Sequence, residues 1–196
     1  IIAAGHGHDN CLELLLAKGA AVNQAKNSGA TALFMAAQKG HDKCLELLLA
    51  KGAAVNQAKN NGATPLGIAA QEGHETCAKL LLAARAVVDQ ANNNGAAPLI
   101  IAVCKGHETC VELLLAARAM VDKAMNNGIT PLFVAMGKGH TACVALLVVA
   151  RAAVDQAIHD GATPLFIAAQ EGHESCVELL LTAHAVVDQA KNNGAK

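Results

Sequence analysis

Hydrophobic and polar positions follow one order that recurs every 33 residues along this chain of 196 residues. In 74–83 the apolar side chains recur at spacings of three and four, which is the stripe of an amphipathic helix. A shorter helix is predicted over 65–71, because Thr64 offers an N-cap oxygen and Pro65 suits the first helical position. The pattern therefore predicts pairs of short helices, repeated along the chain.

A histidine followed three residues later by a cysteine marks each unit. Successive cysteines lie 33 residues apart, and a turn glycine keeps the same step. A fixed period of this length indicates stacked supersecondary units that work through an extended surface rather than one pocket. The pairs are His8/Cys11, His41/Cys44, His74/Cys77, His107/Cys110, His140/Cys143 and His173/Cys176.

Each predicted helix is shorter than the roughly 12–15 residues that an isolated helix needs to be marginally stable in water. Contacts between neighbouring units must therefore hold the helices in place. Asn61-Gly62 predicts a two-residue hairpin turn, because both central residues of that turn need a positive φ. We expect an all-α solenoid from which these hairpin or loop fingers project.

The composition fits thin layers and excludes several classes of partner. The chain is 53% hydrophobic but only 2% aromatic, so its core must be built from Ala, Leu, Val and Ile. A net charge of −1, with both signs interspersed, gives no electrostatic reason to expect nucleic acid or an anionic membrane. The richest apolar stretch, 143–150, is too short to span a bilayer. We expect a soluble chain.

Seven cysteines do not predict disulfides here. Six occupy one equivalent position per unit, and helices of neighbouring units pack about 8–10 Å apart, beyond the roughly 7 Å limit between bridged Cα atoms. Free thiols, together with the absence of any Asn-x-Ser/Thr sequon, favour a reducing, intracellular and cytoplasmic location.

Four recurring motifs resemble the ankyrin repeat. They are Gly-Ala-Thr-Pro-Leu (62–66, 161–165), Ala-Ala-Gln-x-Gly-His (36–41, 69–74, 168–173), Glu-Leu-Leu-Leu-Ala (13–17, 46–50, 112–116) and Gly-Ala-Ala-Val-Asn (19–23, 52–56). The resemblance covers the whole chain and implies an ankyrin-type stack of antiparallel helix pairs with projecting fingers. It also implies a role in binding other proteins.

The repeats divide the chain into a single array over 1–196. We expect partial units at 1–25 and 191–196 and complete units at 26–58, 59–91, 92–124, 125–157 and 158–190. Neither end carries a polar capping repeat, so we expect the chain to be a segment of a longer array or protein.

Two departures from the pattern predict local costs. Ala97 replaces the capping threonine, which removes an N-cap from that unit. Gly19 and Gly52 end the second helix as a left-handed cap should, but other residues stand at the matching places of later units. We expect strain or an altered helix end there. These residues are Arg85, Arg118, Arg151 and His184.

The His-x-x-Cys pairs are the main chemical candidates. Residues three apart on a helix share a face, so two pairs brought together could form a zinc site. We favour a structural role instead: the resemblance implies that the histidines hydrogen-bond the neighbouring loop, and the cysteines lie on the apolar stripe. We expect no metal, cofactor or active site; the one near-match to a dinucleotide fingerprint, 137–142, follows a helix where a strand is required.

The resemblance places partner binding on the fingers and on the inner, concave ends of the first helices. A specific partner needs positions that differ between repeats, and these gather in two adjacent fingers and the helix end between them. Apolar residues there, flanked by polar ones, suggest a hot spot with a polar rim. The candidates are Met125, Ile129, Met136, Lys138, Ile158, His159, Asp160 and Glu171.

Cys104 is a further candidate, because it replaces the glutamine found at Gln38, Gln71 and Gln170. A partner-contacting or redox-sensitive thiol and a tolerated substitution are both open. Neutral drift of a decaying repeat is an equal alternative for the apolar strip, since the convex side of the same unit also departs, at Ala142, Ala145, Val148 and Val149.

Two hypotheses for function follow. The first is a monomeric protein–protein interaction scaffold that holds a partner protein on its concave face. The second is a structural spacer array within a multidomain protein, or a consensus-like engineered array, with no specific ligand of its own.

Overall fold

The computed structural model describes residues 1–187, and the predicted partial unit 191–196 lies outside them. Those residues form twelve helices in six consecutive pairs. Their bounds are α1 Ile2–Gly5, α2 Asp9–Ala17, α3 Ala32–Lys39, α4 Asp42–Ala50, α5 Pro65–Glu72, α6 Glu75–Ala83, α7 Pro98–Lys105, α8 Glu108–Ala116, α9 Pro131–Lys138, α10 Thr141–Val149, α11 Pro164–Glu171 and α12 Glu174–Thr182.

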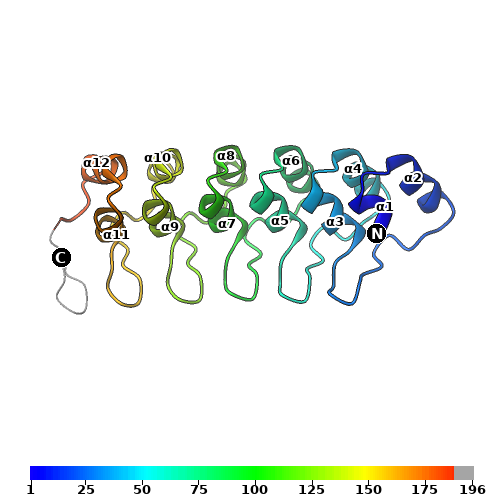
Figure 1. Cartoon of the computed structure of the whole chain (residues 1–196), viewed down its shortest axis with the longest axis horizontal. Coiled ribbons are helices and arrows are strands. Elements are labelled where there is room, and N and C mark those ends of the chain that lie inside the picture. Colours follow the sequence, from blue (N-terminus) through cyan, green and yellow to red (C-terminus); the bar gives the residue numbers. More distant parts are fainter. Residues whose placement is uncertain (188–196) are drawn as a thin grey trace.

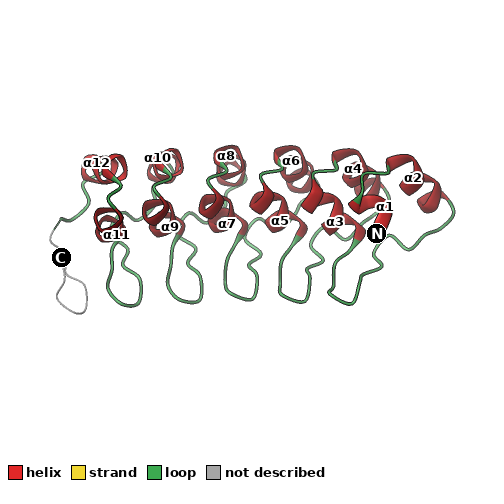
Figure 2. Cartoon of the chain, in the orientation of Figure 1, coloured by secondary structure: helices red, strands yellow, loops and turns green. Residues whose placement is uncertain are grey.

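The helix pairs stack side by side into a solenoid (Figure 1). The even-numbered helices form one row, which we call the outer face. The odd-numbered helices form a second row beneath it, and long loops project from them on the opposite side (Figure 2). We call the surface formed by the odd-numbered helices from α3 to α11 and these finger loops the inner face. The predicted all-α repeat solenoid is confirmed.

The first helix of each pair begins and ends as the sequence predicts. In α5 the Thr64 side chain accepts a hydrogen bond from the Gly67 backbone N–H (3.0 Å), and Pro65 occupies the first helical position. Gly73 ends the helix at φ +73°. A Cβ there would lie 2.7 Å from His107 Nδ1, so both conformation and space require glycine. Thr31, Thr130 and Thr163 cap their helices in the same way, and Ala97 provides no side-chain cap.

The second helix of each pair is followed by a left-handed residue, so at the non-glycine positions the structure has a strained residue and not an altered helix end. Arg118 has φ +63°, its N–H bonds to the Leu115 carbonyl, and the next N–H bonds to that of Leu114. This Schellman pairing satisfies the last carbonyls of α8 and requires a left-handed residue after the helix. Arginine therefore adopts the conformation at a steric cost of about 1–2 kcal/mol. Arg85, Arg151 and His184 also have positive φ.

The finger turn differs from the predicted one. In the finger at 59–63, the Gly62 N–H bonds to the Lys59 carbonyl and the Lys59 N–H to that of Ala63. Only Gly62 has a positive φ, because the Asn61 side chain instead accepts a hydrogen bond from the Ala63 N–H (3.1 Å). The turn is thus a type I turn followed by a left-handed glycine, and the prediction of two positive-φ residues was wrong. Within 1–187 the only β-bridge is Ala25 with Thr31.

Three sets of hydrogen bonds recur between neighbouring units. Asn93 donates its backbone N–H to the Asn61 carbonyl and its side-chain amide to the Asn60 carbonyl, which links neighbouring fingers. An Asn or Asp side chain accepts the backbone N–H found 31 residues later, in the segment after the second helix. His74 Nε2 donates to the Gln38 carbonyl (3.2 Å), as the resemblance implied. The Asn or Asp bonds start from Asn23, Asn56, Asp89, Asp122 and Asp155.

The core runs through the stack as a continuous line of small apolar side chains. Five of the six periodic cysteines are buried in it. Cys11 is exposed, against the prediction that all six belong to the core, because no earlier helix covers α2 on that side. A cysteine at this position is therefore buried by the preceding unit and not by its own.

Restoring the missing cap tests the account of the first helices. Ala97→Thr should raise the free energy of unfolding by about 0.5–2 kcal/mol, because its oxygen would accept the Ile100 N–H. Thr130→Ala is the matched control and should lower stability by a similar amount. Chemical denaturation measures both, and a destabilised Ala97→Thr would contradict the capping account.

Relieving the left-handed arginine tests the strain. Arg118→Gly should raise the free energy of unfolding by about 1 kcal/mol, since glycine removes the Cβ clash. Ala117→Gly, one residue earlier at φ −79°, is the control and should cost about 0.5–1 kcal/mol. A melting temperature of Arg118→Gly at or below that of the parent chain would rule out strain.

Candidate functional site

One finger of the inner face contacts the first helix of the preceding unit. Lys59 holds its ammonium nitrogen 5.1 Å from the ring centroid of Phe34, a cation–π contact that closes this surface near α3. Gln38 and Gln71 lie half-buried near the ends of α3 and α5. A lysine and two glutamines therefore contribute polar groups to the inner face in the first units.

The third unit breaks this pattern and opens a hollow. Met125 stands where Lys59 stands two units earlier, and Ile100 stands where Phe34 does, so an aliphatic pair replaces the cation–π pair. Cys104 replaces the longer glutamine and leaves space at the end of α7. The hollow has a volume of about 210 Å³ and an almost wholly apolar surface. Its lining is Gln71, Ala96, Ile100, Ile101, Cys104, Lys105, Met125 and Val134.

The structure brings two of the predicted site residues together in this hollow. Cys104 lines it and is exposed, and Met125 lines it from the finger and is half-buried. Ile129 and Ile158 are half-buried rather than exposed, so the predicted apolar strip offers less free surface than expected. The polar candidates Lys138, His159, Asp160 and Glu171 are all exposed.

Met136 does not belong to any surface. Its side chain is 0% exposed, because it lies on the face of α9 that points into the core. The prediction that Met136 contacts a partner was therefore wrong. Its neighbour Lys138 lies at the end of the same helix and is exposed, so the helix end carries only one of the two residues predicted there.

Sequence reasoning missed most of the hollow's wall. Ile101 and Val134 occupy a position that is apolar in every complete unit, so no break in the pattern marks them. Ile100 does carry a signal, because three of the four matching positions are phenylalanine. The missing phenylalanine ring at Ile100, taken together with Cys104 and Met125, indicates a site one unit closer to the N-terminus than the predicted one.

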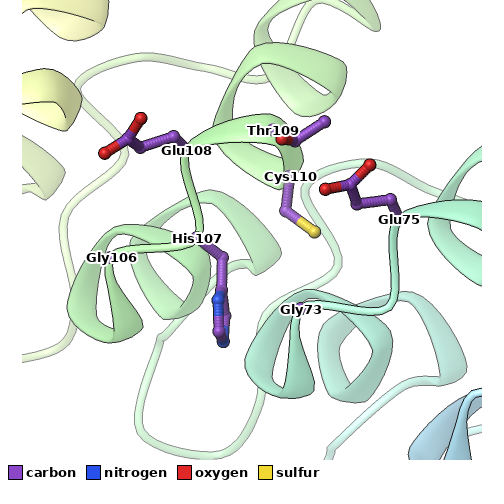
Figure 3. A pocket seen from close by; sticks show the side chains of 7 residues that line it. All are labelled: Gly73, Glu75, Gly106, His107, Glu108, Thr109 and Cys110. Atoms are coloured by element: carbon purple, nitrogen blue, oxygen red, sulfur yellow. The ribbon is translucent and has the colours of Figure 1, made fainter.

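A second kind of hollow lies between the starts of successive outer helices. The one between α6 and α8 has a volume of about 190 Å³ and is lined by Glu75, His107, Glu108, Thr109, Cys110 and two glycines (Figure 3). The sulfur of Cys110 points to the side of the hollow that carries Glu75, while His107 extends away from it. His107 Nε2 donates to the Gln71 carbonyl (3.0 Å) of the preceding unit. His107 and Cys110 therefore have separate structural roles: the histidine bonds to the preceding unit, and the cysteine fills the core.

The buried thiols are held in their neutral form. Burial raises the pKa of Cys110 to about 11, and the Glu75 carboxylate adds to the shift. Burial likewise raises the pKa of Cys143 to about 11, with Glu108 contributing. The pKa of Cys77 is raised further, by burial and by its hydrogen bond to Asp42. Metal ligation and nucleophilic attack both need the thiolate, so these cysteines are poorly suited to either.

Within residues 1–187, no three His, Cys, Asp or Glu side chains are placed to hold a metal ion together. All seven cysteines, each of which falls in that range, are free. No helix among the described residues has the length and apolar character that a bilayer crossing needs.

The inner-face hollow at Cys104 and Met125 is the leading candidate site.

Comparison with known proteins gives a family and a close structural likeness. A family model described as ankyrin repeats matches residues 1–59, 51–124 and 117–193. The crystal structure of the human ASB11 ankyrin repeat domain superposes with a TM-score of 0.90 at 32% sequence identity, over 99% of this chain and 87% of that one. No curated protein matches the chain. The division into five complete repeats stays a prediction, since the three matched segments do not resolve single repeats.

Thiol labelling tests the assignment of the cysteines. In the native chain, Cys11 and Cys104 should react rapidly with a disulfide reagent near pH 8, because both are exposed. Cys110 and Cys143 should react at least about 100-fold more slowly, since a pKa of about 11 depletes the thiolate and burial blocks access. Mass spectrometry of labelled peptides assigns each site, and Cys104→Ala should remove one fast phase. Fast labelling of Cys110 would contradict the structural role.

Proposed function

Because this chain belongs to the ankyrin repeat family, we propose that it is a scaffold that binds a partner protein at the inner-face hollow around Cys104 and Met125. Ankyrin repeat domains are generally protein-interaction modules and are typically non-enzymatic. The observation that carries the proposal is the hollow itself. Its surface is almost wholly apolar, whereas the matching position two units earlier holds the cation–π pair of Lys59 and Phe34.

The hollow has the features of a binding hot spot. Aliphatic walls from Ile101 and Val134 can desolvate one or two apolar side chains of a partner, and the half-buried Met125 can adjust its shape to them. A volume of about 210 Å³ suits an anchor of leucine or methionine size. Since a structural spacer needs no such opening, the hollow favours the scaffold over the spacer array.

Two exposed lysines on this part of the inner face favour a partner with an acidic side chain. Lys105 lines the hollow, and Lys138 is exposed at the matching position of the next unit. Neither lysine forms an ion pair within the described part of the chain. A carboxylate beside the partner's apolar anchor would meet these two ammonium groups, which would favour the correct partner and speed its association.

A double substitution tests this function. Cys104→Gln with Met125→Lys gives the unit the residues that the chain already carries at Gln38 and Lys59, so the fold should be kept. The hollow should be filled and its finger wall made polar. In affinity capture from cell lysate with quantitative mass spectrometry, a specific partner should be retained by the parent chain and reduced at least about tenfold by the variant.

The matched control makes the reverse exchange at the other unit. Gln38→Cys with Lys59→Met changes the same residue types two units away and should leave capture of that partner unchanged. Circular dichroism and thermal melting should show that both variants fold. A partner captured equally by the parent chain and the Cys104→Gln, Met125→Lys variant would place binding elsewhere and overturn the proposal.

A further inference from the structure

The outer face has its own repeated pattern, which the inner-face function does not use. In each outer helix from α4 onward, the first, fifth and ninth residues lie on one side and form an outward row. In four of these helices, two of the three residues are charged. The rows are Asp42/Glu46/Ala50, Glu75/Lys79/Ala83, Glu108/Glu112/Ala116 and Glu174/Glu178/Thr182.

Helix α10 has no charge in this row. Its outward residues are Thr141, Ala145 and Val149, and Val149 is 82% exposed, the most exposed of the large apolar side chains in the described residues. The half-buried Leu146 and Val148 lie beside them and are also apolar. The outward row of α10 is therefore uncharged, and its second half, Ala145 and Val149, is an aliphatic strip that the charged rows of α4, α6, α8 and α12 do not have.

Packing within the chain does not account for this strip. The buried face of α10 is made by Cys143, Val144 and Leu147, which match the buried residues of the other outer helices. A valine left largely in water adds little to the stability of the fold, because it buries little apolar area. Thr141 and Ala145 replace charged residues of the other outer helices, and Val149 replaces an alanine or threonine, so these exchanges change the outer surface and leave the core unaltered.

Acidic side chains border the strip on both sides. Helices α8 and α12 flank α10 in the outer row (Figure 1) and place Glu112 and Glu178 at the height of Ala145. Both glutamates are exposed, and neither forms an ion pair with a described residue. With neighbouring helices about 8–10 Å apart, the two carboxylates stand roughly 16–20 Å apart across the strip.

From this charge pattern we infer that the α10 strip is a second docking surface, for an amphipathic helix whose apolar stripe is bordered by Lys or Arg on both edges. Such a helix is about 10–12 Å wide with its side chains, so basic side chains on its two edges reach both glutamates. The apolar stripe covers Ala145 and Val149. Arg118 and Arg151 are exposed beyond the C-terminal ends of α8 and α10. Because like charges repel, the Lys or Arg residues of the partner helix are expected toward the other end of the strip.

The charges of Glu112 and Glu178 disfavour other kinds of partner at the α10 strip. A second copy of the chain packed through its own α10 would bring the glutamates of one copy against those of the other, at either relative direction of the two helices. An anionic lipid surface would be repelled in the same way. A helix with acidic edges is excluded by the same argument, so charge complementarity selects a basic partner.

Synthetic peptides test the inference on the full chain. The probe is a fluorescein-labelled helical peptide with a Leu stripe and Lys edges, and its comparison peptide has Glu in place of every Lys. The Lys peptide should bind in fluorescence anisotropy with a Kd that weakens with added salt, and the Glu peptide should bind at least about tenfold more weakly. Equal binding of the two peptides would overturn the inference.

Two variants separate the apolar and charged parts of the site. Val149→Thr introduces the residue that α12 carries at Thr182, and Glu112→Gln with Glu178→Gln removes the two border charges. Each should weaken the Lys peptide at least about fivefold. Glu46→Gln, on the outer face of the distant α4, is the matched control and should have no effect. Loss of affinity in the control, or full affinity in Val149→Thr, would show nonspecific attraction and reject the α10 site.

Discussion

Stacking of one helix pair on the next is the interaction on which the whole structure depends. Every helix within residues 1–187 has nine residues or fewer, so none would be stable alone. Each unit gains its core from its neighbour, and the exposed Cys11 shows this directly: the same residue type is buried wherever an earlier unit covers it. Hydrogen bonds from histidine, asparagine and aspartate side chains to backbone groups of the adjacent unit then fix the spacing.

This constraint divides the positions of each unit into two kinds. Residues that face a neighbour must repeat, because each interface uses the same close contacts; His107, for example, lies against Gly73 where a Cβ would clash. Residues that face solvent can change without disturbing the stack. The α10 strip consists of changes of the second kind. The inner-face hollow combines both kinds, because Cys104 is exposed whereas Ile100 is buried and Met125 is half-buried against the preceding unit.

The sequence predicts those features of the fold that recur with the 33-residue period. Matching positions between units predict the helix pairs and the threonine caps, and they mark Arg85 and Arg118 as sites of strain or of an altered helix end. The role of the histidines was implied by the resemblance to the ankyrin repeat. Met136 could not be placed, because the helical face it occupies depends on how α9 lies against its neighbours. The hollow could not be predicted as a cavity, since its side chains come from a finger and from the inner helices α5, α7 and α9, which are distant in the sequence. The finger turn was wrongly assigned because the Asn61 side chain satisfies the turn without a positive φ.

The central claim is that binding takes place where the inner face departs from its repeat. Hydrogen–deuterium exchange of the chain, alone and with a partner recovered by affinity capture, tests it most directly. The account predicts added protection in the first helices and finger around the hollow, within 96–105 and 125–134, with the equivalent segment 30–39 unchanged. Protection confined to 30–39, or spread evenly over all the fingers, would contradict it.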